Sequence, residues 1–100
     1  MAISFDLSTR HLPFSVACAL ATKDIAYSIA LPRGVTRFLL EFEGTTGKYA
    51  FTGTEGSALS GRHSVATDTT VAVEVGGVAP VVYVQSDANT KTVHITALPG

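Results

Sequence analysis

Apolar and polar side chains alternate with a period of two residues through almost the whole chain. In residues 35–43, Phe38, Leu40 and Phe42 share one face, whereas Arg37 lies on the other. In residues 71–75, every second residue is valine. A period of two places successive side chains on opposite faces of a β-strand. The pattern therefore predicts half-buried strands, with one face in a core and the other toward water or a neighbour.

Turn-forming residues divide the alternating segments into eight or nine short strands and leave no convincing helix. The expected strands are residues 3–7, 14–20, 25–31, 35–43, 48–52, 62–67, 69–75, 80–85 and 93–97. Many short strands at regular spacing are typical of an all-β antiparallel sandwich or jelly roll. We expect one β domain over residues 1–100, in which residues 1–22 form either an N-terminal arm or edge strands.

Two of these strands are expected to form the centre of the core. Residues 44–47 have the sequence of a turn, so we expect a hairpin between residues 35–43 and 48–52. In that hairpin the large apolar side chains face one another across the strands. They are Phe38, Leu40, Phe42, Tyr49 and Phe51. Residues 80–85 are apolar on both faces, which predicts a central strand or a strand against a partner.

Charged residues are scarce, at 15% of the chain against roughly a quarter in an ordinary soluble domain. A domain of this size still exposes about a third of its surface to water. The scarcity therefore indicates that other chains cover part of the surface. With 7 basic and 8 acidic residues and no basic stripe, the chain is not expected to bind nucleic acid.

No arrangement of residues points to catalysis or to a bound metal. His11, His63 and His94 are isolated from one another, and no G-x-S-x-G motif is present. Cys18 is the single cysteine and lies in an apolar run, which predicts a buried, inert thiol. The Asp-Ala-Asn sequence at residues 87–89 resembles the start of a calcium loop but lacks the later glutamate, so we interpret it as a turn. We expect no enzyme activity, no cofactor and no metal.

The segment before the amino-terminal apolar run does not have the composition of a signal-peptide n-region, because it carries Asp6 and the hydrophobic residues Ile3, Phe5 and Leu7. No segment approaches the roughly 20 apolar residues that a membrane span requires. We therefore expect a protein that is made in the cytoplasm and does not enter a membrane.

Five residues are candidates for an interface with another chain. The guanidinium groups of Arg33, Arg37 and Arg62 suit pairing with carboxylates between chains, or else they keep strand edges solvated. Tyr83 is an aromatic residue on a strand face, where it suits a core, a subunit contact or a stacked sugar. His94 lies on the face opposite the expected core.

Three segments resemble small β-rich virion structural proteins of tailed bacteriophages. They are LPRGVTRF at residues 31–38, YAFTG at residues 49–53 and VYVQS at residues 82–86, followed by a terminal strand. The resemblance covers roughly residues 24–98, and residues 2–20 lie outside it.

The resemblance implies a capsid decoration or cement protein on the outside of the shell. Its partner would be the capsid protein, its location the virion after synthesis in the host cytoplasm, and its form a homo-oligomer, with a trimer favoured. Alternatives are a head–tail joining or tail structural protein, or a carbohydrate-binding module that uses Tyr83 and the glycine-rich loop at residues 53–61.

Overall fold

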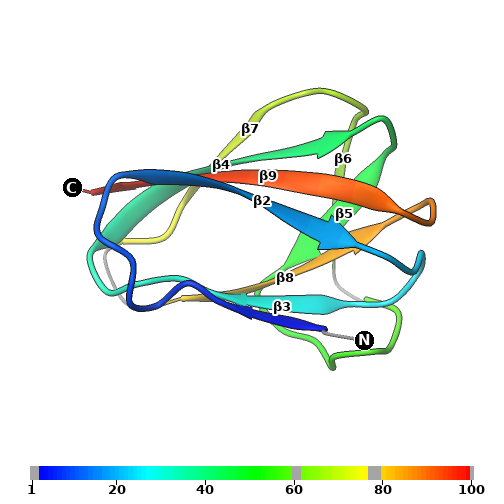
Figure 1. Cartoon of the computed structure of the whole chain (residues 1–100), viewed down its shortest axis with the longest axis horizontal. Coiled ribbons are helices and arrows are strands. Elements are labelled where there is room, and N and C mark those ends of the chain that lie inside the picture. Colours follow the sequence, from blue (N-terminus) through cyan, green and yellow to red (C-terminus); the bar gives the residue numbers. More distant parts are fainter. Residues whose placement is uncertain (1–2, 60–61, 77–79, 100) are drawn as a thin grey trace.

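Nine β-strands and no helix make up the described part of the chain, residues 3–59, 62–76 and 80–99, in the computed structural model (Figure 1). The strands are β1 (Ser4–Asp6), β2 (Phe14–Leu20), β3 (Tyr27–Ala30), β4 (Val35–Glu43), β5 (Gly47–Ala50), β6 (His63–Val65), β7 (Val71–Glu74), β8 (Val81–Ser86) and β9 (Lys91–Pro99). Each coincides with or overlaps one of the alternating segments, so the all-β prediction is confirmed. The predicted turn at Gly76 and residue 77 lies partly outside the described residues.

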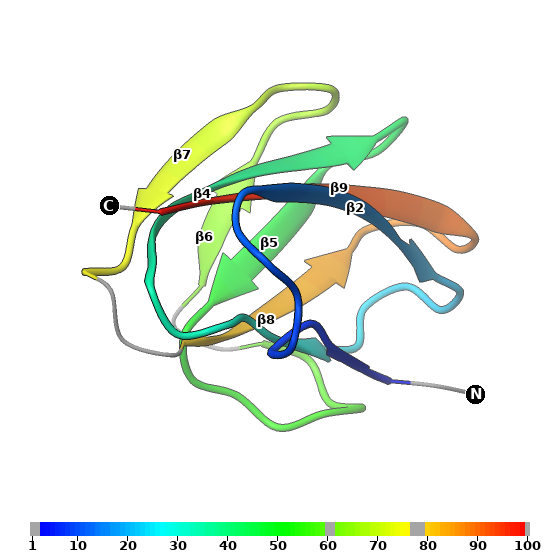
Figure 2. The ribbon, with the colours of Figure 1, turned by 60° about the vertical axis from the view of Figure 1, so that its left-hand side comes forward.

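The strands form two sheets that pack face to face (Figure 2). The five-stranded sheet has the order β1-β3-β8-β5-β6, and the four-stranded sheet has the order β2-β9-β4-β7. All neighbours are antiparallel except β1 and β3, which run parallel. β8 is the central strand of its sheet, as its two apolar faces predict.

The pairing of strands follows jelly-roll topology. β2 pairs with β9, β3 with β8, β4 with β7 and β5 with β6, so the chain resembles one long hairpin folded across two sheets. Contacts of β4 with β9 and of β5 with β8 complete the sheets. β1 is an additional strand at one edge, and β2 is the edge of the other sheet, so the amino-terminal strands belong to the sandwich.

The core lies between the sheets and consists of the residues that alternation assigned to the inner faces. Phe38, Leu40 and Phe42 of β4 are fully buried, while the intervening residues of that strand are half-buried or exposed. The hydroxyl of the buried Tyr27 accepts a hydrogen bond of 2.9 Å from the backbone N–H of Thr22. The other inward residues with no measurable exposure include Leu20, Ile29, Val35, Val82, Val84, Val93, Ile95 and Ala97.

The predicted hairpin between β4 and β5 is wrong. β4 lies between β9 and β7, and β5 lies between β8 and β6, so residues 44–46 carry the chain from one sheet to the other. Gly47 begins β5 directly against the ring of Phe42, and a side-chain carbon at position 47 would overlap that ring. The turn sequence is compatible with both connections, because it determines that the chain reverses and not which strand it pairs with.

Phe51 is not at the centre of the core, contrary to the prediction. It follows the last residue of β5, and 44% of its surface is exposed. Its ring packs edge-on against Phe38, with centroids 6.4 Å apart, and against Tyr49, at 6.2 Å. Phe51 therefore covers one end of the core instead of filling it.

Truncation of Phe38 and of Phe51 should have different effects on stability. We expect Phe38→Ala to lower the free energy of unfolding by about 3–5 kcal/mol, because it leaves a cavity in a closed core. Phe51→Ala should cost only about 1 kcal/mol, because its ring is already half-solvated. Denaturant unfolding of both variants measures the difference, and equal losses would contradict this placement of the two rings.

Candidate partner-binding face

The two outer faces of the sandwich differ in what covers them. The middle of the outer face of the five-stranded sheet is covered by the chain itself, in the segment that connects β5 to β6 (Figure 2), whereas outward residues of the edge strands β1 and β6 are exposed. Within that segment Glu55 forms a β-bridge with Ala26 and accepts a hydrogen bond of 2.6 Å from Ser28 Oγ. The backbone N–H of Leu59 donates to Gln85 Oε1 at 2.7 Å, which attaches the segment to β8.

The outer face of the four-stranded sheet is bare. None of the outward side chains that the structure describes on β2, β9, β4 and β7 is buried. We call this surface the open face. It comprises Ser15, Ala17, Ala19, Thr92, His94, Thr96, Leu98, Arg37, Leu39, Glu41, Glu43, Ala72 and Glu74.

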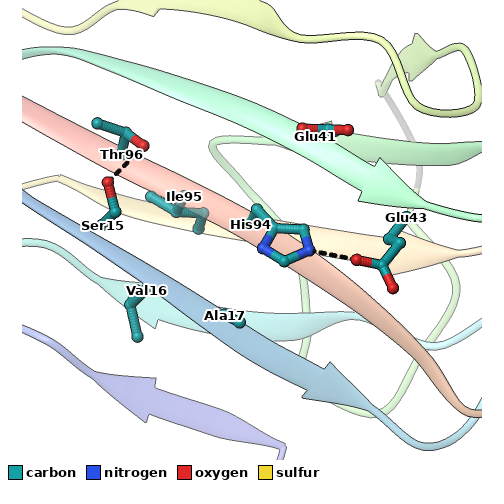
Figure 3. Close-up of a pocket in the computed structure, with 8 residues that line it drawn as sticks. All are labelled: Ser15, Val16, Ala17, Glu41, Glu43, His94, Ile95 and Thr96. Carbon is teal, nitrogen blue, oxygen red and sulfur yellow. Dashed lines mark hydrogen bonds and ion pairs between the residues drawn. The ribbon is translucent and has the colours of Figure 1, made fainter.

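A shallow hollow of about 490 Å³ lies at the middle of the open face (Figure 3). It exists because β2 contributes only small outward side chains, Ser15 and Ala17, beside the longer residues of β9 and β4. The Oγ atom of Ser15 lies 2.9 Å from Oγ1 of Thr96. His94 Nε2 lies 2.8 Å from Glu43 Oε1; the His94 side chain is half-buried and the Glu43 side chain is largely exposed.

Charge is unevenly distributed over the open face. Its β2 and β9 half carries no charged residue apart from His94, which is charged only when protonated. Glu41 and Glu43 stand along β4 at the border of that half. The arrangement is an uncharged strip beside a row of carboxylates, which suits a partner with an apolar contact and basic groups at its border.

The structure places two of the five predicted interface residues on the same face, although they are not neighbours there. His94 and the exposed Arg37 both lie on the open face, and Arg37 is opposite Glu74 on β7. Arg33 is exposed in the turn between β3 and β4. Arg62 lies beside the covered sheet, where its Nη1 donates to the carbonyl of Leu59 at 2.7 Å.

Tyr83 lies on the covered face and not on an open platform. It is half-buried in a small cluster with Ala26, Ala50 and Leu59. A side-chain carbon at Gly53 would lie 3.4 Å from the Tyr83 ring, so the connecting segment runs directly over that ring. The chain itself therefore occupies the surface that a stacked sugar would use. Of the loop at residues 53–61, residues 60 and 61 lie outside the described part.

The carboxylate of Asp87 binds protein groups, in agreement with the turn interpretation. It forms an ion pair with Lys48 and accepts a hydrogen bond from Thr46 Oγ1, and Asn89 Oδ1 accepts from the backbone N–H of Lys23. In residues 3–59, 62–76 and 80–99, no cluster of three or more histidine, cysteine or acidic side chains is placed to hold a metal.

Packing and hydrogen bonding shift the pKa values of Asp87 and Cys18 in opposite directions. Burial alone would raise the pKa of Asp87, but hydrogen bonds from Lys48 and Thr46, with the charges of Lys48 and Arg62, hold it below its ordinary value. Burial raises the pKa of the Cys18 thiol, only partly opposed by the charge of Arg10. Cys18 is 2% exposed, so the structure agrees with the prediction of a buried thiol.

Sequence reasoning identified His94 and Arg37 on this surface but missed the residues around them. Ser15, Ala17 and Thr96 occupy the positions of their alternating segments that point away from the core, and nothing in the sequence distinguishes them from other such positions. Their meeting in one hollow depends on the pairing of β2 with β9. Alternation identifies outward positions, but the neighbours of each position come from strand order and register.

Replacement of Asp87 should give a pH-dependent loss of stability. Because the folded-state pKa lies below the ordinary value of 3.8, the carboxylate stabilises the fold above that pH, and this stabilisation disappears as pH falls through the folded-state value. We expect Asp87→Asn to lower the free energy of unfolding at pH 7 by about 1 kcal/mol or less, since the ion pair is partly exposed.

The free energies of unfolding of the wild type and of Asp87→Asn should become equal as the pH is lowered. Denaturant unfolding of both proteins from pH 7 to pH 3 would measure this. Asp24→Asn is the matched control, because this exposed carboxylate has no hydrogen bond or ion pair with any residue that the structure describes. An Asp87→Asn difference that stays constant with pH would contradict the assignment.

Comparison with known proteins gives no further assignment. The described part of the chain has no helix that is long and apolar enough to cross a membrane. No protein-family model, no curated protein and no solved structure matches the chain.

Proposed function

We propose that this chain is a structural virion protein that decorates the outside of a capsid shell and stabilises it. The proposal begins from the resemblance of residues 31–38, 49–53 and 82–86 to small virion proteins of tailed bacteriophages. Jelly-roll domains occur among viral capsid proteins, but also in lectins and cupins, so the topology is compatible with the proposal without selecting it.

The observation that favours a binding role most strongly is the contrast between the two outer faces. A connecting segment covers the middle of the five-stranded sheet, whereas the open face has no cover from any described residue. Its half on β2 and β9 has His94 as the only ionisable outward side chain and contains the shallow hollow, so another protein can pack against it without burying many charges. We propose that the open face contacts the shell.

Such a protein acts without chemistry. A domain that touches two neighbouring capsid subunits adds buried surface across the joint between them, and this stabilises the joined state in proportion to occupancy. The row of Glu41 and Glu43 would face basic groups of the shell, so association should weaken as the salt concentration rises.

The test is addition of the purified protein to mature capsids of the same virus that were assembled without it. We expect it to sediment with the capsids and to raise their melting temperature in calorimetry. Thr96→Arg introduces a large charge at the centre of the open face and should abolish both effects. Ser4→Arg, on the exposed outer side of β1, is the control and should retain them.

Both variants should unfold like the wild type, because each position is at least partly exposed. Capsids that melt at the same temperature with and without the protein would contradict a decoration role. Electron microscopy of labelled protein distinguishes decoration from the structural alternative. Density over the shell would indicate decoration, whereas density at a single vertex would indicate a head–tail joining or tail protein.

A further inference from the structure

The two sheets have four edges, and one differs from the others. β1 and β6 are three residues long, and β7 has four residues and carries Glu74. Short strands and edge charges are the usual protection against pairing with another chain. β2 has seven residues, FSVACAL, with no charge and no proline, so it lacks these protective features.

The backbone of β2 is paired on one side only. Its partner in the sheet is β9, and among the described residues no backbone hydrogen bond outside the sheets involves residues 14–20. In an antiparallel pair, alternate residues direct their N–H and C=O groups away from the partner. About half of the backbone polar groups of β2 therefore face outward along its free edge.

We propose that β2 pairs antiparallel with β2 of a second copy of this chain, across a two-fold axis at Ala17. Ala17 is the middle residue of the strand, so this register uses all seven residues. The pairing joins two four-stranded sheets into one continuous sheet. With the axis at Ala17, odd-numbered residues of one strand lie opposite odd-numbered residues of the other, and even-numbered residues lie opposite even-numbered ones. The residues whose N–H and C=O groups point away from β9 therefore lie opposite each other and can form hydrogen bonds between the two copies.

A second copy suits this edge because the strand is complementary to itself. On the inner side, Phe14 and Val16 would lie opposite Leu20 and Cys18 of the second copy. Phe14 and Val16 are half-buried and can contact it, whereas Cys18 and Leu20 are already covered within each copy. On the outer side, the small residues Ser15, Ala17 and Ala19 would meet one another without a clash. No like charges face each other, because the strand has none.

The pairing goes beyond the proposed function, since it holds whether the open face contacts a capsid or another partner. It places two open faces side by side, with the uncharged β2 and β9 strips in the middle and Glu41 and Glu43 at both outer borders. Two linked faces bind a repeating surface more tightly than one. A two-fold contact closes with two copies, in place of the trimer that the resemblance implies.

Disulfide trapping tests the register directly. Ala17→Cys, made in a Cys18→Ala background, places one thiol from each copy at the two-fold axis, where opposite strand residues are close enough for a disulfide. Mild oxidation should convert most of this variant to a covalent dimer. Ala72→Cys in the same background is the control, because it is exposed on β7 of the same sheet.

Light scattering over a concentration series supplies a second measurement on the wild-type protein. We expect the mass to rise from one copy toward two. Ala17→Lys should suppress the rise by placing two like charges together, while Ala72→Lys should not. Equal disulfide yields at positions 17 and 72, a constant monomer, or a mass of three copies would overturn the proposal. Capsid binding is measured separately, so failure of one proposal is distinguishable from failure of the other.

Discussion

The fold depends on a single apolar layer between two sheets, into which nearly every strand directs alternate side chains. The constraint is tightest where β4 crosses to β5, because Phe42 fills the space in which residue 47 would carry a side chain. Glycine at that position lets the chain approach the core closely and continue into the other sheet. The chain also crosses between the sheets from β2 to β3, from β3 to β4, from β6 to β7, from β7 to β8 and from β8 to β9, and these crossings produce the jelly-roll order of the strands.

Once the core is filled, the two outer faces become available for different uses. Glu55 and Leu59 attach a connecting segment to the five-stranded sheet, and this segment also covers part of Tyr83. The opposite sheet has no such cover among the described residues, and its small β2 side chains produce the hollow beside His94. A chain with few charges thus presents one broad surface that is suited to protein contact.

The free edge of β2 is adjacent to this open face, so one strand contributes to both proposed contacts. Its inner residues pack toward the core, its outer residues line the hollow, and half of its amides are unpaired within the described sheet. Fold alone does not assign a role, since the same topology serves viruses, lectins and enzymes. The proposals therefore depend on the chemistry of this face and this edge.

The sequence by itself determined the existence of all nine strands, the inward positions of β4 and the burial of Cys18, because a period of two is a local property. Only the tertiary structure decided that β4 pairs with β9 and β7, that Phe51 lies at an end of the core, and that Tyr83 lies under a connecting segment. Those features depend on which distant segments meet, and alternation is the same for every choice of partner strand. The hollow beside His94 likewise required the register between β2 and β9, since its residues are separated by most of the chain.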